Sequence, residues 1–370
     1  ASVRGGTLNL NKTSIDGTVE NMPTAESVLS LVTSGSVTAS SFSQDRTSCC
    51  GERTWGGSLA ELIIFDRALN ATEVGNVEDY LALKWGVTST TTEWSGAVST
   101  DWSNASNWSN GVPSSSLNCL ISDKANDPVI SSGIASCRDI TISNGTVTLT
   151  TSSASVLEVY GNFSNTGTLN LNDNTLSIND KGVVSTNQTM SQPASLGKLR
   201  FSKTAGGTFT FTDTSLTVND LNMASGSNFI FRIINGKTLV VPNGMTVAGG
   251  TFDVDAGGSV LVGDTQSIDV TGGKFMVSGV NDAFPQATSN KGILGINGSG
   301  RWGFNATGGE VAFTGFIVDY IDGSGLNISG NSNLSALDGG QFTHLLKDYS
   351  TPVKAIQLNT STNISESVAS

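Results

Sequence analysis

The chain of 370 residues is long enough for two or three domains with a sizeable core. It contains 43 Gly but only 7 Pro, and 14% of its residues are charged, which favours short strands and tight turns over helices. The chain is too rich in Val, Ile, Leu and Phe to be disordered. The formal net charge of −12 argues against nucleic acid and anionic membranes as partners, and no run of about 18 apolar residues occurs that would insert into a membrane.

Residues 1–65 alternate apolar and polar side chains in short runs, the pattern of half-buried strands. Two such runs are residues 7–10 and 28–32. Residues 59–65, LAELIIF, are longer and more apolar, so they are predicted to form a buried strand.

Residues 70–85 are predicted to form a helix. Asn70 suits the N-cap position and Glu73 follows three residues later, which is the capping-box pattern. Lys84 lies in the last turn and Gly86 ends the helix. One face of this helix is predicted to be apolar, and it carries Val74, Val77, Leu81 and Trp85.

Residues 56–87 resemble the closing segment of a laminin-G-like, concanavalin-type jelly-roll domain of bacterial surface proteins. Such domains end with a G-x-(I/L)-A-E-(I/V)-I-(I/V)-(Y/F)-x-R-A-L strand and a short helix that reaches K-(W/Y)-G. The matching residues are Gly57, Ala60, Glu61, Arg67, Ala68, Leu69, Lys84, Trp85 and Gly86. The resemblance implies that residues 1–87 are the C-terminal part of such a domain, without its front half. The family binds glycans and sometimes calcium, through loops that would lie mostly in the absent part.

A Ser/Thr-rich linker, residues 88–93, leads into a segment rich in tryptophan, residues 94–113. Trp94, Trp102 and Trp108 are three of the six tryptophans of the chain. The Ser, Asn and Gly residues between them indicate a compact loop held by aromatic rings, each with an N–H that needs a partner. We expect Trp94, Trp102, Trp108 and Pro113 to form a structural cap on one end of a long β structure. A surface loop with no special role is the alternative.

The same segment resembles a second pattern, which is found in secreted Bacteroidetes-type surface proteins and adhesins. That pattern contains W-x-G, D-W and N-W-x-x-G-x-P, then P-x-I, then a C-x-(N/D)-(L/I)-x-I strand that leads into a β-helix. The matching residues are Trp94, Gly96, Asp101, Trp102, Asn107, Trp108, Gly111 and Pro113. The resemblance covers residues 94 to about 180 and implies export, through type IX secretion, to the bacterial cell surface.

Four cysteines are present, and they allow three pairings. Cys119 and Cys137 flank a predicted turn, so we expect them to form a disulfide in an oxidising compartment. Cys49 and Cys50 are adjacent, and they either bridge each other or pair elsewhere. A metal site with four thiolates is the alternative, but no CxxC spacing occurs and the only histidine is His344.

From Asn144 onward, pairs of apolar residues separated by one polar residue recur every seven to ten residues, with Gly-containing turns between them. Examples are Leu157/Val159, Phe229/Phe231, Phe252/Val254, Phe275/Val277, Phe316/Val318 and Ile356/Leu358. Two or three such strands per turn would build a right-handed parallel β-helix of about ten coils, each covering its neighbour's apolar face. An antiparallel sandwich is the alternative.

No catalytic motif of the G-x-S-x-G, H-E-x-x-H, P-loop or EF-hand type occurs. Two carboxylate pairs, Asp253/Asp255 and Asp319/Asp322, have the chemistry to chelate calcium or to act as acid and base. Such pairs are more often solvated surface charges, and the sequence shows no Arg, Lys or His gathered beside them. Tyr160 and Tyr320 are predicted to be exposed aromatics that suit stacking on sugars. Trp302, by its spacing from Phe304, is assigned to the core.

These observations predict an all-β chain with four parts: a partial jelly-roll segment with one short helix (1–87), a linker (88–93), the cap and first coil (94–143) and the β-helix (144–370). The predicted function is that of a non-catalytic segment of a large bacterial cell-surface or secreted adhesin, extracellular, acting as a rigid stalk and contact surface. The expected partners are glycans or surface proteins of other cells, and further copies of the chain in a surface appendage. No cofactor is expected, with calcium as an alternative. The alternative functions are a polysaccharide-active lyase or hydrolase on the β-helix flank and a glycan-binding module.

Overall fold

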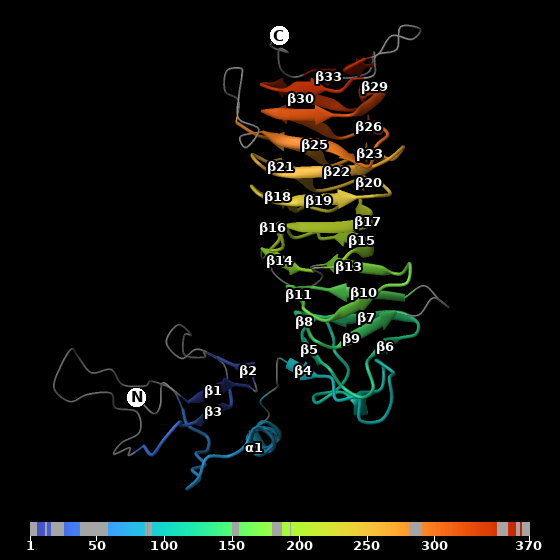
Figure 1. Cartoon of the computed structure of the whole chain (residues 1–370). Helices are drawn as coiled ribbons and strands as arrows, with labels where there is room; N and C mark the ends of the chain where they lie inside the picture. The colour runs from blue at the N-terminus through green and yellow to red at the C-terminus, as the bar shows by residue number, and fades with distance from the viewer. Residues whose placement is uncertain are drawn as a thin grey trace, which may run out of the picture. The chain divides into compact units, whose positions relative to one another are not determined.

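A computed structural model of the chain describes residues 6–11, 13–15, 26–37, 58–85, 87, 91–149, 155–179, 187–192, 194–280, 291–345, 354–359 and 363–364. The chain divides into two compact units, Ala1–Thr91 and Thr92–Ser370. The predicted fold class is confirmed: the chain is mostly β, with one short helix, and its parallel strands form a β-solenoid of about ten turns (Figure 1).

The first unit contains a small antiparallel sheet and a helix. Its strands, in the order β2-β1-β3, are β1 (Thr7–Leu10), β2 (Thr13–Ser14) and β3 (Leu29–Val32). Helix α1 (Ala71–Trp85) carries the buried Glu78 carboxylate, which accepts hydrogen bonds from Ser30 Oγ at 2.5 Å and Asn9 Nδ2 at 3.3 Å. Because both donors lie on the sheet, this carboxylate joins the helix to β1 and β3.

The predicted capping box of α1 is confirmed. Asn70 Oδ1 accepts the Glu73 N–H at 3.0 Å, and Glu73 Oε2 accepts the Asn70 N–H at 2.9 Å. Arg67 donates to both Glu73 oxygens at 2.8 Å. The Arg67 guanidinium, followed by the Asn70 N–H, lowers the pKa of Glu73 to about 2. The predicted apolar face is only partly buried, since Val74 is buried but Trp85 is exposed.

The prediction of a buried strand at residues 59–65 is wrong. These residues form no strand, and Ile64 is 80% exposed. Within the described part of the chain, no strand pairs with them to complete a ladder. Glu61 instead accepts hydrogen bonds from Lys84 Nζ at 3.2 Å and Trp85 Nε1 at 2.7 Å, so the segment is held against the end of α1.

The second unit is a parallel β-solenoid with three faces. Face 1 contains β4 (Thr91–Glu93), β5 (Asn118–Ser122), β8 (Ile140–Ser143), β11 (Phe163–Asn165), β14 (Gln188–Ser191), β16 (Thr208–Phe211), β18 (Ile230–Ile233), β21 (Thr251–Asp255), β24 (Lys274–Ser278), β27 (Glu310–Thr314), β30 (Asn333–Asp338) and β33 (Asn363–Ile364). Thus residues 91–93, which were expected to belong to the linker, form the first strand of this face.

Face 2 contains β7 (Gly133–Cys137), β10 (Ser155–Val159), β13 (Thr175–Asn179), β15 (Leu196–Ser202), β17 (Ser215–Met223), β20 (Met245–Val247), β23 (Ser267–Val270), β26 (Trp302–Ala306), β29 (Ile321–Ile328) and β32 (Ile356–Leu358). Face 3 starts at the long strand β17, which it shares with face 2, and continues with β19 (Thr238–Val241), β22 (Ser259–Gly263), β25 (Gly292–Asn297), β28 (Phe316–Asp319) and β31 (Gln341–Thr343). In the first coils the third side is a separate sheet of β6 (Val129–Ile130), β9 (Thr146–Leu149) and β12 (Thr168–Asn170).

The ladders between successive coils are parallel, which excludes the antiparallel sandwich. The predicted apolar pairs point inward along nearly the whole solenoid and join the residues from Trp94 to Leu334 into one core. At the C-terminal end the pattern fails, because Leu358 is exposed.

No helix of the described segments has the length and apolar character needed to cross a membrane.

A continuous row of phenylalanine rings runs through this core, and we call it the phenylalanine spine. Adjacent ring centroids lie between 4.7 and 5.6 Å apart. Its members are Phe201, Phe209, Phe231, Phe252, Phe275, Phe304, Phe313, Phe316 and Phe342. Because each ring touches one in a neighbouring strand or coil, the spine ties the coils together along the solenoid.

Candidate functional site

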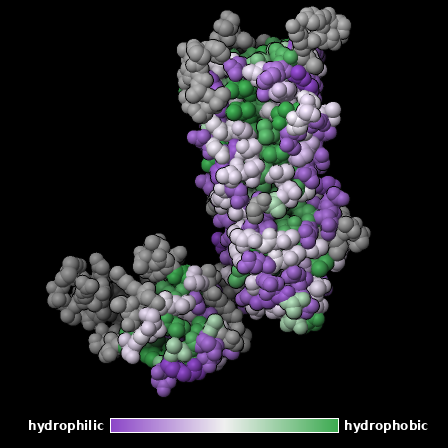
Figure 2. All heavy atoms as spheres, in the orientation of Figure 1, coloured by the Kyte–Doolittle hydropathy of each residue, from purple (hydrophilic) through white to green (hydrophobic). Residues whose placement is uncertain are grey.

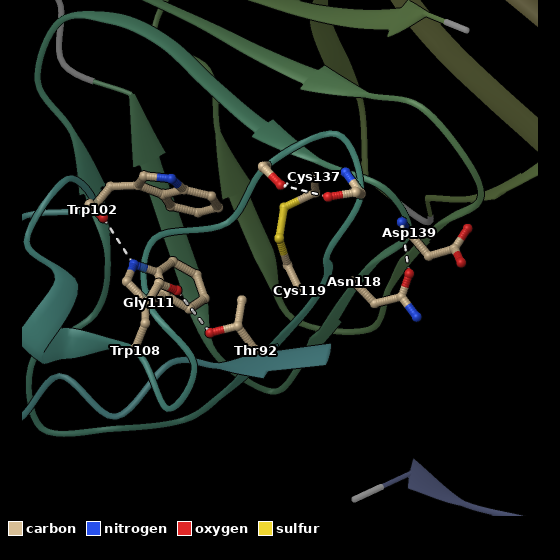
Figure 3. The surroundings of a disulfide bond; sticks show 10 residues. Thr92, Trp102, Trp108, Gly111, Asn118, Cys119, Cys137 and Asp139 are labelled. Atoms are coloured by element: carbon tan, nitrogen blue, oxygen red, sulfur yellow. Dashed lines mark hydrogen bonds between the residues drawn. A yellow bond between two sulfur atoms is a disulfide. The ribbon is translucent and has the colours of Figure 1, made fainter. Parts of the chain in front are cut away.

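The three tryptophans of residues 94–113 pack on one another in the first coil. Trp108 meets Trp94 edge-to-face at 5.0 Å and Trp102 at 4.8 Å, and all three rings are buried. Trp94 Nε1 donates to the carbonyl of Asn126 at 2.7 Å. Trp108 Nε1 donates to the carbonyl of Trp102 at 2.8 Å (Figure 3). Trp102 Nε1 is buried without a partner among the described residues. Pro113 is also buried.

The side chain of Asn107 organises the backbone of this tryptophan loop. It is fully buried, and its Oδ1 accepts the N–H groups of Val98 at 2.9 Å and Ser99 at 3.0 Å. Its Nδ2 donates to the carbonyl of Asp101 at 2.9 Å. Gly96 has φ +57°, and a Cβ there would lie 2.4 Å from the carbonyl oxygen of Asn126, so glycine is required at that position. The sequence pattern contains both residues, but only the structure shows these roles.

The predicted disulfide between Cys119 and Cys137 is confirmed. Cys119 lies on β5 and Cys137 ends β7, with Cα atoms 5.8 Å apart and both side chains buried close to the tryptophan loop (Figure 3). These two cysteines therefore do not belong to a four-thiolate metal site. Cys49 and Cys50 lie outside the described residues.

Removal of the bridge by Cys119→Ala/Cys137→Ala is expected to lower the free energy of unfolding by about 3 kcal/mol, because it closes a short loop of the unfolded chain. Urea unfolding followed by circular dichroism measures this loss. The variant Cys49→Ala/Cys50→Ala keeps the bridge and serves as the control. Equal midpoints for the parent and the Cys119→Ala/Cys137→Ala variant would contradict the prediction.

Tyr160 was predicted to be exposed, and this is wrong. Its side chain is 6% exposed, and its hydroxyl donates to Glu158 Oε2 at 2.6 Å. Burial, and then the hydrogen bond to the Glu158 carboxylate, raise the pKa of Tyr160 to about 12. The residue follows the inward position Val159, so the alternation along the strand did not indicate its burial.

This raised pKa predicts a loss of stability in alkali. The folded chain holds the phenolic proton more tightly than the unfolded chain, whose tyrosines titrate near pH 10. The contribution of Tyr160 to the free energy of unfolding is therefore complete below about pH 10 and is lost as the pH rises towards 12. Tyr160→Phe is expected to flatten this part of the profile of urea midpoint against pH. Tyr80→Phe, at a half-exposed ring, is the control, and parallel profiles for Tyr160→Phe and the parent would refute the assignment.

The two members of the first carboxylate pair differ in burial, since Asp253 is buried and Asp255 is partly exposed. Asp253 points outward between the inward residues Phe252 and Val254, yet it is 4% exposed, so the prediction of a solvated charge is wrong for it. Arg232 Nε donates to Asp253 Oδ2 at 3.0 Å, and Ser278 Oγ donates to its other oxygen. Asp253 is thus held by an ion pair to β18 and a hydrogen bond to β24, the two strands of face 1 that flank its own. Across the described segments, no group of three or more His, Cys, Asp or Glu residues is arranged to hold a metal ion.

One member of the second pair, Asp319, lies in a set of residues that we call the corner cluster: Arg301, Asp319, Tyr320 and His344. The other member, Asp322, accepts the Ser324 N–H at 2.8 Å. Asp319 Oδ1 lies 2.7 Å from His344 Nδ1 and accepts a hydrogen bond from Thr343 Oγ1 at 2.7 Å. The rings of Tyr320 and His344 stack at 4.4 Å with 12° between their planes. The expectation that no basic group gathers at this carboxylate is therefore wrong.

Arg301 completes the corner cluster. Its guanidinium carbon lies 5.4 Å from the centroid of the Tyr320 ring. It donates to the carbonyls of Ile321, at 3.2 Å, and of His344. These contacts connect the turn before β26 with the turns after β28 and β31, so the cluster draws on three successive coils.

The backbone at this corner is unusual. Tyr320 has φ +54° and His344 has φ +48°, a region that non-glycine residues seldom adopt. In earlier coils the same corner, between face 3 and face 2, carries Gly244 at φ +82° and Thr265 at φ +61°. A side chain in such a conformation costs on the order of 1–3 kcal/mol, so two aromatic rings are held here at some expense of stability.

The chemistry available at the corner follows from the hydrogen bond of the imidazole. Since Nδ1 faces the Asp319 carboxylate, it carries the proton, and Nε2 is the nitrogen left to accept or donate. Among the described residues no group bonds to Nε2, and 59% of the His344 side chain is exposed. The Asp319 carboxylate is partly exposed as well. The corner therefore presents an acceptor, an imidazole and aromatic surface to solvent.

Comparison with known proteins finds one family model. It describes a domain of unknown function, DUF8693, and it matches residues 93–201. No curated protein and no solved structure matches the chain. The matched region contains the tryptophan loop, the disulfide and the first coils of the solenoid, and the corner cluster lies outside it.

Proposed function

We propose that the chain is a non-catalytic segment of a large bacterial cell-surface or secreted adhesin, in which the solenoid is a rigid stalk and contact surface. The observation that carries this proposal is the uninterrupted core from Trp94 to Leu334, with the phenylalanine spine inside it. Each coil is bonded to the next by a parallel ladder, and from Phe201 to Phe342 ring contacts are added, so bending or stretching there must break both. A solenoid of this kind suits transmission of force between an anchor and a contact point.

An extracellular location belongs to this proposal. The buried bridge between Cys119 and Cys137 is of a kind that forms and persists in oxidising compartments. The resemblance of the tryptophan pattern to exported surface proteins supports the same location. Glycans or surface proteins of other cells are the proposed partners, and the jelly-roll resemblance of residues 1–87 keeps a glycan-binding module as an alternative.

The outer side of face 3 supports association of the chain with copies of itself. Figure 2 shows apolar atoms at the visible surface of the upper coils. On face 3, Val240 of β19 and Leu261 of β22 are half-buried outward residues that pair with each other, and Ile293 of β25 is a half-buried outward residue beside Ser259. Apolar side chains gathered on a solvated face are typical of an interaction surface. Sedimentation velocity is expected to show dimers or larger species that Leu261→Asp reduces to monomers.

An assay for turnover tests the non-catalytic part of the proposal. The purified chain is incubated with a broad panel of polysaccharides, and the expected result is no new reducing ends and no unsaturated products. Beads coated with the chain are expected to attach to bacterial cells better than beads coated with albumin. Turnover that disappears in Asp319→Asn would contradict the non-catalytic role and favour an enzyme. Beads that attach no better than the albumin control would contradict the role in adhesion.

A polysaccharide-active enzyme is the second candidate, and one observation favours it. The hydrogen bond from His344 to Asp319 gives the imidazole the carboxylate partner that general bases often have. The same turnover assay separates the two candidates, since only the enzyme would lose product formation in His344→Asn.

A further inference from the structure

The rings of Tyr320 and His344 are not explained by the fold. Both side chains lie outside the apolar core. Ile321, which follows Tyr320 in the chain, belongs to that core. Both also occupy left-handed turn positions where Gly244 serves in an earlier coil. Neither the core nor the turn therefore requires an aromatic side chain at these two positions, which points to a role at the surface.

The arrangement of the corner cluster resembles a binding surface. Three planar groups from successive coils, the Arg301 guanidinium, the Tyr320 phenol and the His344 imidazole, follow one another at 5.4 and 4.4 Å. The Asp319 carboxylate lies against the edge of the imidazole at 2.7 Å. Aromatic surface combined with a few polar groups in fixed positions is the usual composition of a small-molecule site.

We propose that the corner cluster binds a neutral saccharide. Sugar hydroxyls would donate to Asp319 and exchange a hydrogen bond with His344 Nε2, while the apolar C–H face of the sugar ring would pack on the exposed imidazole. This inference rests on the proposed attachment role and assigns a glycan contact to these four residues.

The charges at the corner favour a neutral ligand over an acidic one. Asp319 supplies a carboxylate, and the permanent cation of the cluster is Arg301. The guanidinium already donates to the carbonyls of Ile321 and His344, so it pins the backbone of two turns. A uronate or sulfate group would thus meet the Asp319 carboxylate and a cation that is already engaged. A divalent cation is disfavoured as well, since the described residues here offer no set of three metal-ligating side chains.

His344 provides a direct test because it is the only histidine of the chain. In tag-free protein the imidazole ¹H–¹³C signals therefore come from this residue alone. The signals are followed during titration with oligosaccharides of laminarin, mannan and galactan, which are neutral, and of pectate and alginate, which are acidic. A saturable shift with at least one neutral oligosaccharide, and none with the acidic ones, is expected. Titrations in which no neutral oligosaccharide moves the signals, or in which only acidic ones do, would overturn the proposal.

Two variants distinguish a binding site from a structural turn. Tyr320→Gly removes the ring and relaxes the left-handed backbone, so it is expected to keep the melting temperature of the parent or raise it while weakening binding at least tenfold. Thr265→Gly makes the same backbone change at the same corner of an earlier coil, and it should bind as the parent does. Equal affinity of Tyr320→Gly and the parent would refute the site.

The outcomes also separate this inference from the stalk proposal. Cleavage of a bound neutral oligosaccharide by the parent would refute the non-catalytic role and leave the binding site in place. Attachment of coated beads to cells without any shift of the His344 signals would refute the saccharide site at the corner cluster. The proposed role as an adhesin would then stand.

Discussion

Replacing Trp108 by alanine is expected to lower the free energy of unfolding by about 3–5 kcal/mol, as for other large buried side chains. Trp108 is the central ring of the tryptophan loop, since it contacts both Trp94 and Trp102. Its indole N–H also satisfies the carbonyl of Trp102, which would be left without that donor. The loss of both contacts would open the N-terminal end of the solenoid and expose strand edges that favour aggregation.

Urea unfolding followed by circular dichroism, together with size-exclusion chromatography and light scattering, measures both effects. Val98→Ala is the matched control, because Val98 is an exposed residue of the same loop. It is expected to change stability by less than about 0.5 kcal/mol. If Trp108→Ala unfolds at the same urea concentration as the parent and stays monomeric, the three rings do not act as a cap.

A second large effect is expected at the middle of the phenylalanine spine. Phe231 is fully buried and contacts Phe201 and Phe209 at 5.1 Å and Phe252 at 5.3 Å. Phe231→Ala should therefore cost about 3–5 kcal/mol, because the cavity lies where rings of neighbouring coils meet and cannot easily collapse. The cost is expected to be local, so hydrogen exchange should rise first in the strands on either side of β18.

Ile230 offers the comparison, since it precedes Phe231 on the same strand and points outward. Ile230→Ala is expected to cost less than about 1 kcal/mol, because its side chain is only partly buried. Similar unfolding midpoints for Phe231→Ala and Ile230→Ala would show that the spine does not stabilise the stack.

Much of the fold follows from local sequence patterns. An apolar residue at every second position must place both members of a pair on one side of a strand, so Phe252/Val254 and Phe275/Val277 identified the core directly. The helix was likewise visible because Asn70 and Glu73 make a capping box within four residues. The bridge between Cys119 and Cys137 followed from their spacing of about one coil.

The corner cluster could not be predicted in this way. Asp319 and His344 meet because β28 and β31 lie next to each other in the stack. The coils differ in length, with 23 residues between the paired Val254 and Val277 and 36 between Val277 and Phe313. A fixed repeat therefore does not give the register, and a contact between residues of different coils cannot be read from the chain.

Three burial predictions failed for a related reason. The alternation and apolar content of a segment show which of its side chains are suited to burial. Whether these side chains are buried depends on the strands and polar partners that surround them in the folded chain. Residues 59–65 are apolar enough for a core strand, yet no described strand covers them. Tyr160 and Asp253 are polar enough for the surface, yet Glu158 and Arg232 provide the partners that allow their burial.

The parallel ladders give the solenoid a direction of assembly. The tryptophan loop, both bridged cysteines and strands β5, β7 and β8 all precede residue 144, so the first coil can close as soon as that part of the chain has emerged from a ribosome or across a membrane. Each later coil then needs only the one before it as a template, because its ladder partners are already in place. On the proposed route of export, every coil that docks would also prevent the chain from sliding back, so folding itself would draw the remainder of the polypeptide outward.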